Sequence, residues 1–182
     1  MAKNFLFTKI RVALIKSAIK RTDYLVKHGI FQSVGEHFFF QPRIIPQDAK
    51  LIKFGNNVVV AAGVKFINHD VIHKMLNHLP NNSHKFTKKY SCIEICDNVF
   101  IGANVIIMGD VKIGSNVIVA AGAIVTKDIP DNSIVAGVPA KVIGDFDSYL
   151  QKTMDEERIA TIGDYEEADV YQCWKRFNDE HL

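Results

Sequence analysis

Cysteine is scarce in this chain. Only three occur in 182 residues, at Cys92, Cys96 and Cys173. An odd number in a chain of this length does not indicate a disulfide framework, and the Cys-x3-Cys spacing matches no common zinc site. We therefore expect reduced thiols, as in a cytoplasmic protein, and no bound metal.

Long apolar runs and a dominant charge are also missing. No stretch approaches the roughly 20 apolar residues of a membrane span. Charged residues interrupt the N-terminal apolar positions, and no small-residue cleavage site follows, so we expect no signal peptide. A net charge of +2 gives no sign of a nucleic-acid partner. Residues 1–28 carry seven Lys or Arg and one acid, whereas residues 145–182 carry eleven acids and four Lys or Arg.

The composition, 48% hydrophobic and 23% charged, predicts one globular domain over residues 1–182. Residues 1–30 are predicted to hold an N-terminal helix, because residues 4–27 lack Gly and Pro and Gly29 can cap the end. Its basic residues raise the possibility of weak contact with a membrane surface. Its apolar residues are spread widely, however, which favours burial against the main domain.

The acidic tail, residues 145–182, is predicted to form two helices that cover one end of the domain. The expected spans are 147–162 and 164–180, with Asp147 and Asp164 as N-caps. Gly163 separates them. Trp174 and Phe177, three residues apart, are expected to pack together on one helix face.

Between these ends the chain repeats every six residues. From Ile95 it reads ICDNVF, IGANVI, IMGDVK, IGSNVI, VAAGAI, VTKDIP, and from Phe54 it reads FGNNVV, VAAGVK, FINHDV. The first position is always apolar, and the fourth is Asn, Asp or Gly in every group but one. These residues tolerate a positive φ at low cost, so each group predicts a short strand followed by a sharp corner. A six-residue period leaves no fixed apolar face on a helix, so the pattern indicates a parallel β-solenoid.

Residues 71–92 break this rhythm. The segment is polar and rich in His and Lys, and ordered insertions of this length in a compact domain are usually functional. A loop that binds an acidic ligand and a solvated loop fit this sequence equally well.

The ending TKDIPDNSIVAGVPAKVIG, together with the six-residue groups, resembles the hexapeptide-repeat acyltransferases. The similar branch holds the xenobiotic, maltose and serine acetyltransferases and the sugar and polysaccharide O-acetyltransferases, and the match covers residues 48–144. The resemblance implies a mainly β fold: a left-handed parallel β-helix of about three coils, against the usual right-handed rule. It also implies a homotrimer that binds acetyl-CoA in the grooves between neighbouring subunits.

His69 stands at the fourth position of FINHDV, where the family carries its catalytic histidine. The resemblance implies that His69 is a general base, which takes the proton of an acceptor hydroxyl during direct transfer. Some relatives pair this histidine with a distant carboxylate, which the sequence does not identify. Asn68 and Asp70 are candidate acceptor-binding residues. For Asp70 three readings stay open: holding the acceptor hydroxyl, capping the turn of the insertion, or no role.

Contacts to acetyl-CoA carry over by motif to five positions. The resemblance implies that small residues leave room for the pantetheine arm and that lysines suit its phosphates. The positions are Ala103, Ala121, Thr126, Lys127 and Lys141.

These features predict an acetyl-CoA-dependent O-acetyltransferase acting on a sugar or surface-polysaccharide hydroxyl. Alternative acceptors are an antibiotic hydroxyl, serine or an amino sugar. A zinc enzyme of the γ-carbonic-anhydrase type also uses this fold, and His73-x4-His78 fits it in isolation, but the second run of repeats has no histidine. A non-catalytic structural β-helix is the third class.

Overall fold

The computed structural model describes residues 2–155 and 167–181. Contacts divide the chain into two compact units, Met1–Ser148 and Tyr149–Leu182, and each is treated by itself. The predicted Gly163 break, the Asp164 cap and the end of the first tail helix lie outside the described residues.

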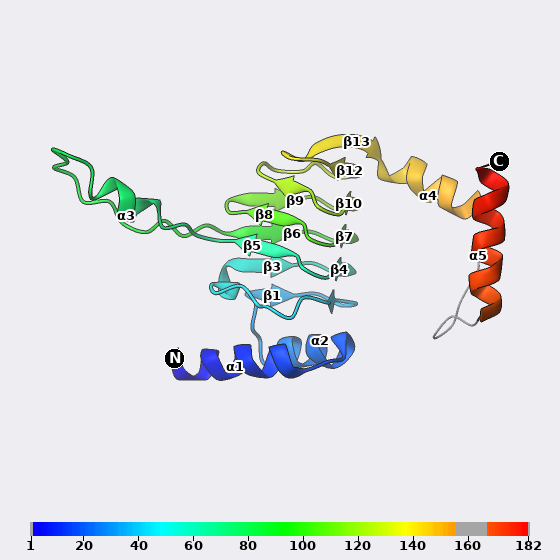
Figure 1. The fold of residues 1–182 in the computed structure, drawn as a ribbon. Helices are drawn as coiled ribbons and strands as arrows, with labels where there is room; N and C mark the ends of the chain where they lie inside the picture. Colours follow the sequence, from blue (N-terminus) through cyan, green and yellow to red (C-terminus); the bar gives the residue numbers. More distant parts are fainter. Residues whose placement is uncertain (1, 156–166, 182) are drawn as a thin grey trace. The chain divides into compact units, whose positions relative to one another are not determined.

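The six-residue groups form short strands separated by corners, as predicted (Figure 1). The first residue of all nine groups is buried and points into one column: Phe54, Val60, Phe66, Ile95, Ile101, Ile107, Ile113, Val119 and Val125. Seven of the nine fourth positions have φ between 53° and 74°, namely Asn57, Gly63, Asn98, Asn104, Asp110, Asn116 and Gly122.

The prediction of a positive φ at the fourth position of each group is wrong at His69 and at Asp128, which are not among the residues with positive φ. At His69 the chain does not turn into another strand of the coil. Instead it leaves the β-helix, and His69 forms an isolated antiparallel bridge with Tyr90 on the returning segment. The insertion therefore replaces the corner.

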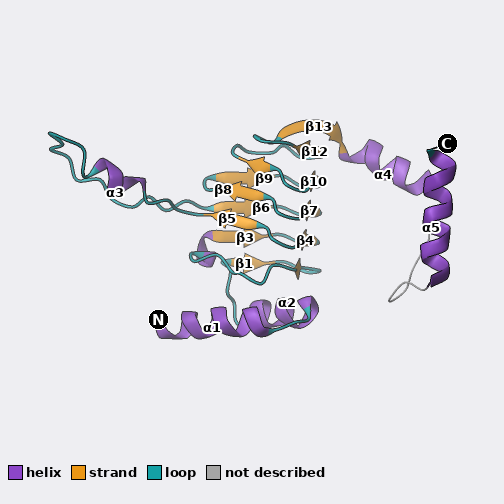
Figure 2. Cartoon of the chain, viewed as in Figure 1, coloured by secondary structure: helices purple, strands orange, loops and turns teal. Residues whose placement is uncertain are grey.

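Three sheets make the three sides of the solenoid (Figure 2). The first holds β1 (Ser33–Val34), β3 (Ile52–Phe54), β6 (Ile93–Ile95) and β9 (Val111–Ile113), in that order. The second runs from β2 (Phe39–Phe40) through β4 (Val58–Val60), β7 (Val99–Ile101), β10 (Val117–Val119) and β12 (Ser133–Ala136) to β13 (Lys141–Asp145). The third, called here the site sheet, holds β5 (Lys65–Ile67), β8 (Ile106–Met108) and β11 (Ile124–Val125).

Three coils contribute a strand to every side: β3–β4–β5, β6–β7–β8 and β9–β10–β11. Incomplete coils flank them at both ends. All pairings between coils are parallel, and only β13 runs antiparallel, to β12. This reversal ends the coiling.

Corner side chains reinforce the stack. Nδ2 of Asn57 donates to Oδ1 of Asn98 at 3.0 Å, and Nδ2 of Asn98 donates to Oδ1 of Asn116 at 2.9 Å. The ladder links three successive coils at one corner. The amide groups that favour a left-handed backbone thus also join the coils.

The N-terminal segment forms two helices rather than one. α1 spans Ala2–Leu14 and α2 spans Ala18–Lys27, and Ser17 between them caps α2 by accepting from Lys20 N at 3.3 Å. Gly29 ends α2 at φ +53°, as predicted. The expected burial of this region holds for α2, whose Leu25 is buried, but among residues 6–14 of α1 only Val12 is buried.

Aromatic residues fill the first coils next to α2. The ring centroids of Phe31 and Phe54 are 4.9 Å apart, and those of Phe38 and Phe54 are 4.8 Å apart. Phe40 lies 6.5 Å from Phe66. Further along, only aliphatic side chains occupy the core, so the aromatic cluster defines the N-terminal end of the solenoid.

The tail begins with α4 (Phe146–Asp155), and α5 spans Glu167–Glu180. The carboxylate of Asp145, not the predicted Asp147, accepts from the N–H of Ser148 at 2.8 Å. Trp174 and Phe177 pack edge to face with centroids 5.5 Å apart, as predicted.

The insertion leaves β5, forms the short helix α3 (Ile72–Leu76) and returns to β6 (Figure 1). Asn77 ties its two arms together: its Nδ2 donates to Phe86 O at 2.8 Å, and its Oδ1 accepts from Phe86 N at 2.7 Å. Lys89 pairs with Asp110 of the β-helix at 2.6 Å. The insertion is therefore ordered at both its far end and its base.

Candidate active site

A carboxylate holds the predicted catalytic histidine. Nδ1 of His69 is hydrogen-bonded to Oδ2 of Asp48, just before the 3₁₀ turn η1 (Ala49–Leu51). The two side chains are 20% and 21% exposed, so the pair is largely shielded from water but still reachable. Because Asp48 occupies Nδ1, the other ring nitrogen, Nε2, is the one left for a substrate.

The base of the insertion fixes the position of His69. Asn68 is buried, its Nδ2 donates to Ser91 O at 3.1 Å, and its carbonyl accepts from Ser91 N at 2.7 Å. The ring of Tyr90 lies with its centroid 5.9 Å from that of His69. Asn68 thus holds the returning segment of the insertion next to His69. Its Oδ1 has no hydrogen-bond partner within residues 2–155 and 167–181.

Asp70 has a local structural contact. Its Oδ1 accepts from the N–H of Ile72 at 3.0 Å, at the start of α3. This geometry matches the reading in which Asp70 caps the turn of the insertion. The side chain is not part of the Asp48–His69 pair.

The residues expected to bind acetyl-CoA lie around the site sheet. Ala103 and Ala121 are stacked at the corner where β8 and β11 begin, since Gly122 N donates to Ala103 O at 2.8 Å. Thr126 and Lys127 follow directly after β11, just as His69 follows β5, so all three lie at the same end of the strands of the site sheet. Two strand spacings, about 10 Å, separate β5, which precedes His69, from β11, which precedes Thr126.

Lys141 approaches from the neighbouring side. It opens β13, and Ala140 before it donates its N–H to the carbonyl of Ile124 in β11 at 2.8 Å. Lys127 and Lys141 are both exposed. The fold therefore brings the five positions, which span 39 residues of sequence, to the borders of one sheet. Of these, Ala103 and Ala121 have small side chains.

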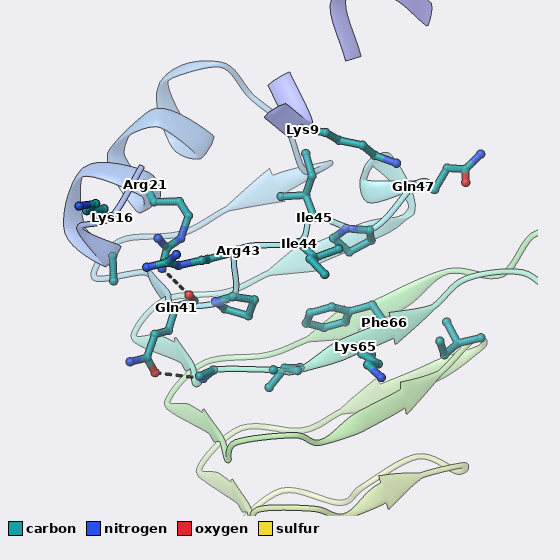
Figure 3. A pocket seen from close by; sticks show the side chains of 17 residues that line it. Lys9, Lys16, Arg21, Gln41, Arg43, Ile44, Ile45, Gln47, Lys65 and Phe66 are labelled. Carbon is teal, nitrogen blue, oxygen red and sulfur yellow. Dashed lines mark hydrogen bonds between the residues drawn. The ribbon is translucent and has the colours of Figure 1, made fainter. Parts of the chain in front are cut away.

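A cavity of about 770 Å³ opens at the N-terminal edge of the site sheet (Figure 3). Its wall includes Ile67 of β5, two residues before His69, and Gln47, next to Asp48. Neither this cavity nor Asp48 was indicated by the sequence, because both depend on how the segment before β3 packs against β5.

The described residues give little indication of cysteine or metal chemistry at this site. Cys92, Cys96 and Cys173 are free thiols, and burial raises the pKa of Cys96. Across the described ranges, no three His, Cys, Asp or Glu side chains are grouped to hold a metal ion. His73 and His78 of the zinc alternative therefore lack a third ligand in this part of the chain. No described helix is long and apolar enough to cross a membrane.

Comparison with known proteins also indicates a hexapeptide-repeat protein. Residues 93–127 match the family described as bacterial transferase hexapeptide (six repeats). Protein CapG of Staphylococcus aureus is 40% identical over 127 residues, which cover 66% of this chain and 68% of CapG. The galactoside O-acetyltransferase of Escherichia coli (strain K12) is 37% identical over 113 residues, 60% of this chain and 52% of that protein. The chain thus spans about half the length of the latter relative.

A solved structure shares the fold. Galactoside acetyltransferase in complex with coenzyme A superposes with a TM-score of 0.58 and 25% identity, over 88% of this chain and 84% of the other. The predicted fold, a left-handed parallel β-helix of about three complete coils with helices and an inserted loop, is confirmed.

A three-sided parallel β-helix built from six-residue groups is the fold that this chain shares with the hexapeptide-repeat proteins. The chain belongs to the bacterial hexapeptide-repeat transferase family.

Proposed function

We propose that this protein is an acetyl-CoA-dependent O-acetyltransferase that acts on a sugar or surface-polysaccharide hydroxyl. The observation that carries the proposal is the Asp48–His69 hydrogen bond, which lies at the edge of the sheet that the five candidate acetyl-CoA positions border. The relatives named as galactoside acetyltransferases support the acceptor class.

His69 acts as the general base. Asp48 accepts the Nδ1–H, which fixes the tautomer whose Nε2 carries a lone pair. Nε2 takes the proton of the acceptor hydroxyl while that oxygen forms a bond to the thioester carbonyl carbon. The carbon–sulfur bond then breaks, and His69 returns the proton to the departing CoA thiolate. Asp48 stabilises the imidazolium between these two events, so no covalent enzyme intermediate is required.

The candidate contacts to acetyl-CoA divide by chemistry. Ala103 and Ala121 present no bulk beyond Cβ at their corner, so the pantetheine arm can lie against the backbone there. Thr126 contributes a hydroxyl close to the His69 edge. Lys127 and Lys141 supply exposed positive charges for the phosphates.

The active unit in this proposal is a homotrimer in the cytoplasm. Exposed apolar residues on α1, among them Leu6, Phe7 and Leu14, support an association, since each is more than 60% exposed in the single chain. A neighbouring subunit covers them in the proposal, and weak contact with a membrane surface is the alternative that the basic residues raise. Light scattering, with and without lipid vesicles, separates the two.

The test of function has two parts. Calorimetry measures acetyl-CoA binding, and thiol release is then followed with acceptors that offer a sugar hydroxyl, an antibiotic hydroxyl, serine or an amino sugar. The proposal predicts binding and thiol release with a saccharide, giving an ester that mild base cleaves. Transfer to the amine alone contradicts O-acetylation, and absence of acetyl-CoA binding contradicts the enzyme assignment.

A further inference from the structure

The cavity beside β5 gathers positively charged side chains. Five cationic side chains line it: Lys9, Lys16, Arg21, Arg43 and Lys65. No Asp or Glu is among its lining residues in the described chain. α2 begins at the wall with Ala18, so the positive end of that helix also faces this space. A surface with this surplus of positive charge attracts anions.

Arg21 and Arg43 form the centre of this charge (Figure 3). Arg21 is only 2% exposed; its Nη1 donates to Ile15 O at 2.7 Å, its Nη2 donates to Gln41 O, and its Nε has no hydrogen-bond partner among residues 2–155 and 167–181. Burial and the nearby charge of Arg43 lower the pKa of Arg21 from its usual range. Two guanidinium groups that repel each other, one of them buried with a free donor, are arranged to receive an acceptor-rich group.

The cavity also has an apolar wall. Pro42, Ile44 and Phe66 contribute carbon surface next to the charged end, and Ile44 is 83% exposed. A small inorganic anion would leave this surface unused. A ligand that carries an anionic group on a larger body with apolar faces uses both parts.

The charged cavity leads to the catalytic pair. Lys65 and Ile67 line it, and His69 follows on the same side of the extended chain, because side chains alternate along a strand. The α carbons of Lys65 and His69 are roughly 13 Å apart at the usual rise per residue. Gln47 connects the opposite wall to Asp48. One ligand can therefore place an anionic group in the cavity and a hydroxyl at His69.

We propose that the cavity binds a phosphate group of the acceptor, so that the substrate is a phosphorylated saccharide rather than a neutral sugar. This inference rests on the proposed function. The recognition chemistry is common to a sugar phosphate and to a nucleoside diphosphate sugar. The guanidinium of Arg43 and the ammonium groups of Lys16 and Lys65 contact the phosphate oxygens, and the free Nε–H of Arg21 donates from the buried side.

The experiment titrates inorganic pyrophosphate into the full-length protein without acetyl-CoA and measures heat or a shift in melting temperature. Wild-type protein is expected to bind, and Arg43→Gln and Lys16→Gln are each expected to weaken binding about tenfold, with Arg43→Lys retaining most of it. Both residues are exposed, so the folded β-helix is retained. A parallel titration with UDP asks whether a nucleotide adds affinity beyond its diphosphate.

A matched variant locates the binding. Lys53→Gln removes an exposed charge from β3, on another side of the β-helix, and is not expected to change pyrophosphate affinity. No binding by wild type, or unchanged affinity in Arg43→Gln, overturns the inference. Because acetyl-CoA is absent from this titration, failure of the enzyme assignment would appear separately, as pyrophosphate binding without acetyl-CoA binding.

Discussion

Asp48 and His69, 21 residues apart in sequence, are joined by a hydrogen bond between a carboxylate oxygen and Nδ1 of the imidazole. Asp48 belongs to the segment between the incomplete N-terminal coil (β1 and β2) and β3, and His69 stands where the first complete coil, β3–β4–β5, gives way to the insertion. Stacking of the coils brings the two together. The pair thus depends on the fold and not on a local motif.

Replacing Asp48 by Asn is expected to lower kcat about a hundredfold or more, because a neutral amide neither fixes the tautomer as firmly nor stabilises the imidazolium. Acetyl-CoA affinity and the melting temperature are expected to stay near the wild-type values. Asp23→Asn, an exposed change on α2, is the matched control. If Asp48→Asn kept wild-type kcat, the carboxylate would have no part in catalysis.

The sequence predicted the fold more fully than the site. Nine apolar first positions and a corner residue of the Asn, Asp or Gly type specify a column and its turns, so the coils follow from local chemistry. Asp48 carries no such signal, because its partner is set by the register between coils. The corner at His69 was mispredicted for a related reason: the bridge to Tyr90 on the returning strand overrides the six-residue pattern there.

At the N-terminal end of the chain, too, a local feature was predicted and the effect of tertiary contacts was not. Gly29 was identified as a helix cap from its own conformational freedom, and it has φ +53°. The break at Ser17, which divides the predicted helix, was not foreseen. Arg21 near the start of α2 bonds to the carbonyls of Ile15 and Gln41, so tertiary contacts hold the two helices in place.

Asp70→Ala is expected to leave kcat within about threefold of wild type, because the Asp70 carboxylate contacts the N–H of Ile72 and not His69. Loss of this cap instead loosens the start of the insertion. Limited proteolysis within residues 71–90 is expected to accelerate, and Asp70→Asn, which can still accept the hydrogen bond, is expected to restore resistance. A loss of kcat comparable to that of Asp48→Asn would place Asp70 in the chemistry.

The asparagine ladder predicts a graded effect on stability. Asn98→Ala loses two side-chain hydrogen bonds and keeps a Cβ at φ +57°, and it is expected to lower the free energy of unfolding by about 2–3 kcal/mol. Asn98→Gly relieves the backbone strain and is expected to cost less, about 1–2 kcal/mol. Urea denaturation measures both.

Asn104→Ala is the matched control for the ladder. Asn104 has φ +59° but takes no part in the asparagine ladder, so only the backbone cost is expected, about 1 kcal/mol. Equal losses for Asn98→Ala and Asn104→Ala would mean that the ladder adds nothing to stability.

Lys127→Gln and Lys141→Gln are each expected to raise the Kd for acetyl-CoA about fivefold, since each removes one exposed charge from the proposed phosphate contacts. The effect should shrink at high ionic strength, because salt screens exposed charges. Calorimetry at two salt concentrations measures it, with Lys53→Gln as the control. Wild-type affinity in the double variant would remove both lysines from the cofactor site.

Acceptor-dependent thiol release by His69→Ala tests whether His69 is the base for transfer from acetyl-CoA. The predicted result is a fall in kcat of about a thousandfold with acetyl-CoA affinity retained. His84→Ala, an exposed histidine of the insertion, should remain near wild type. Near-normal turnover by folded His69→Ala would contradict the account.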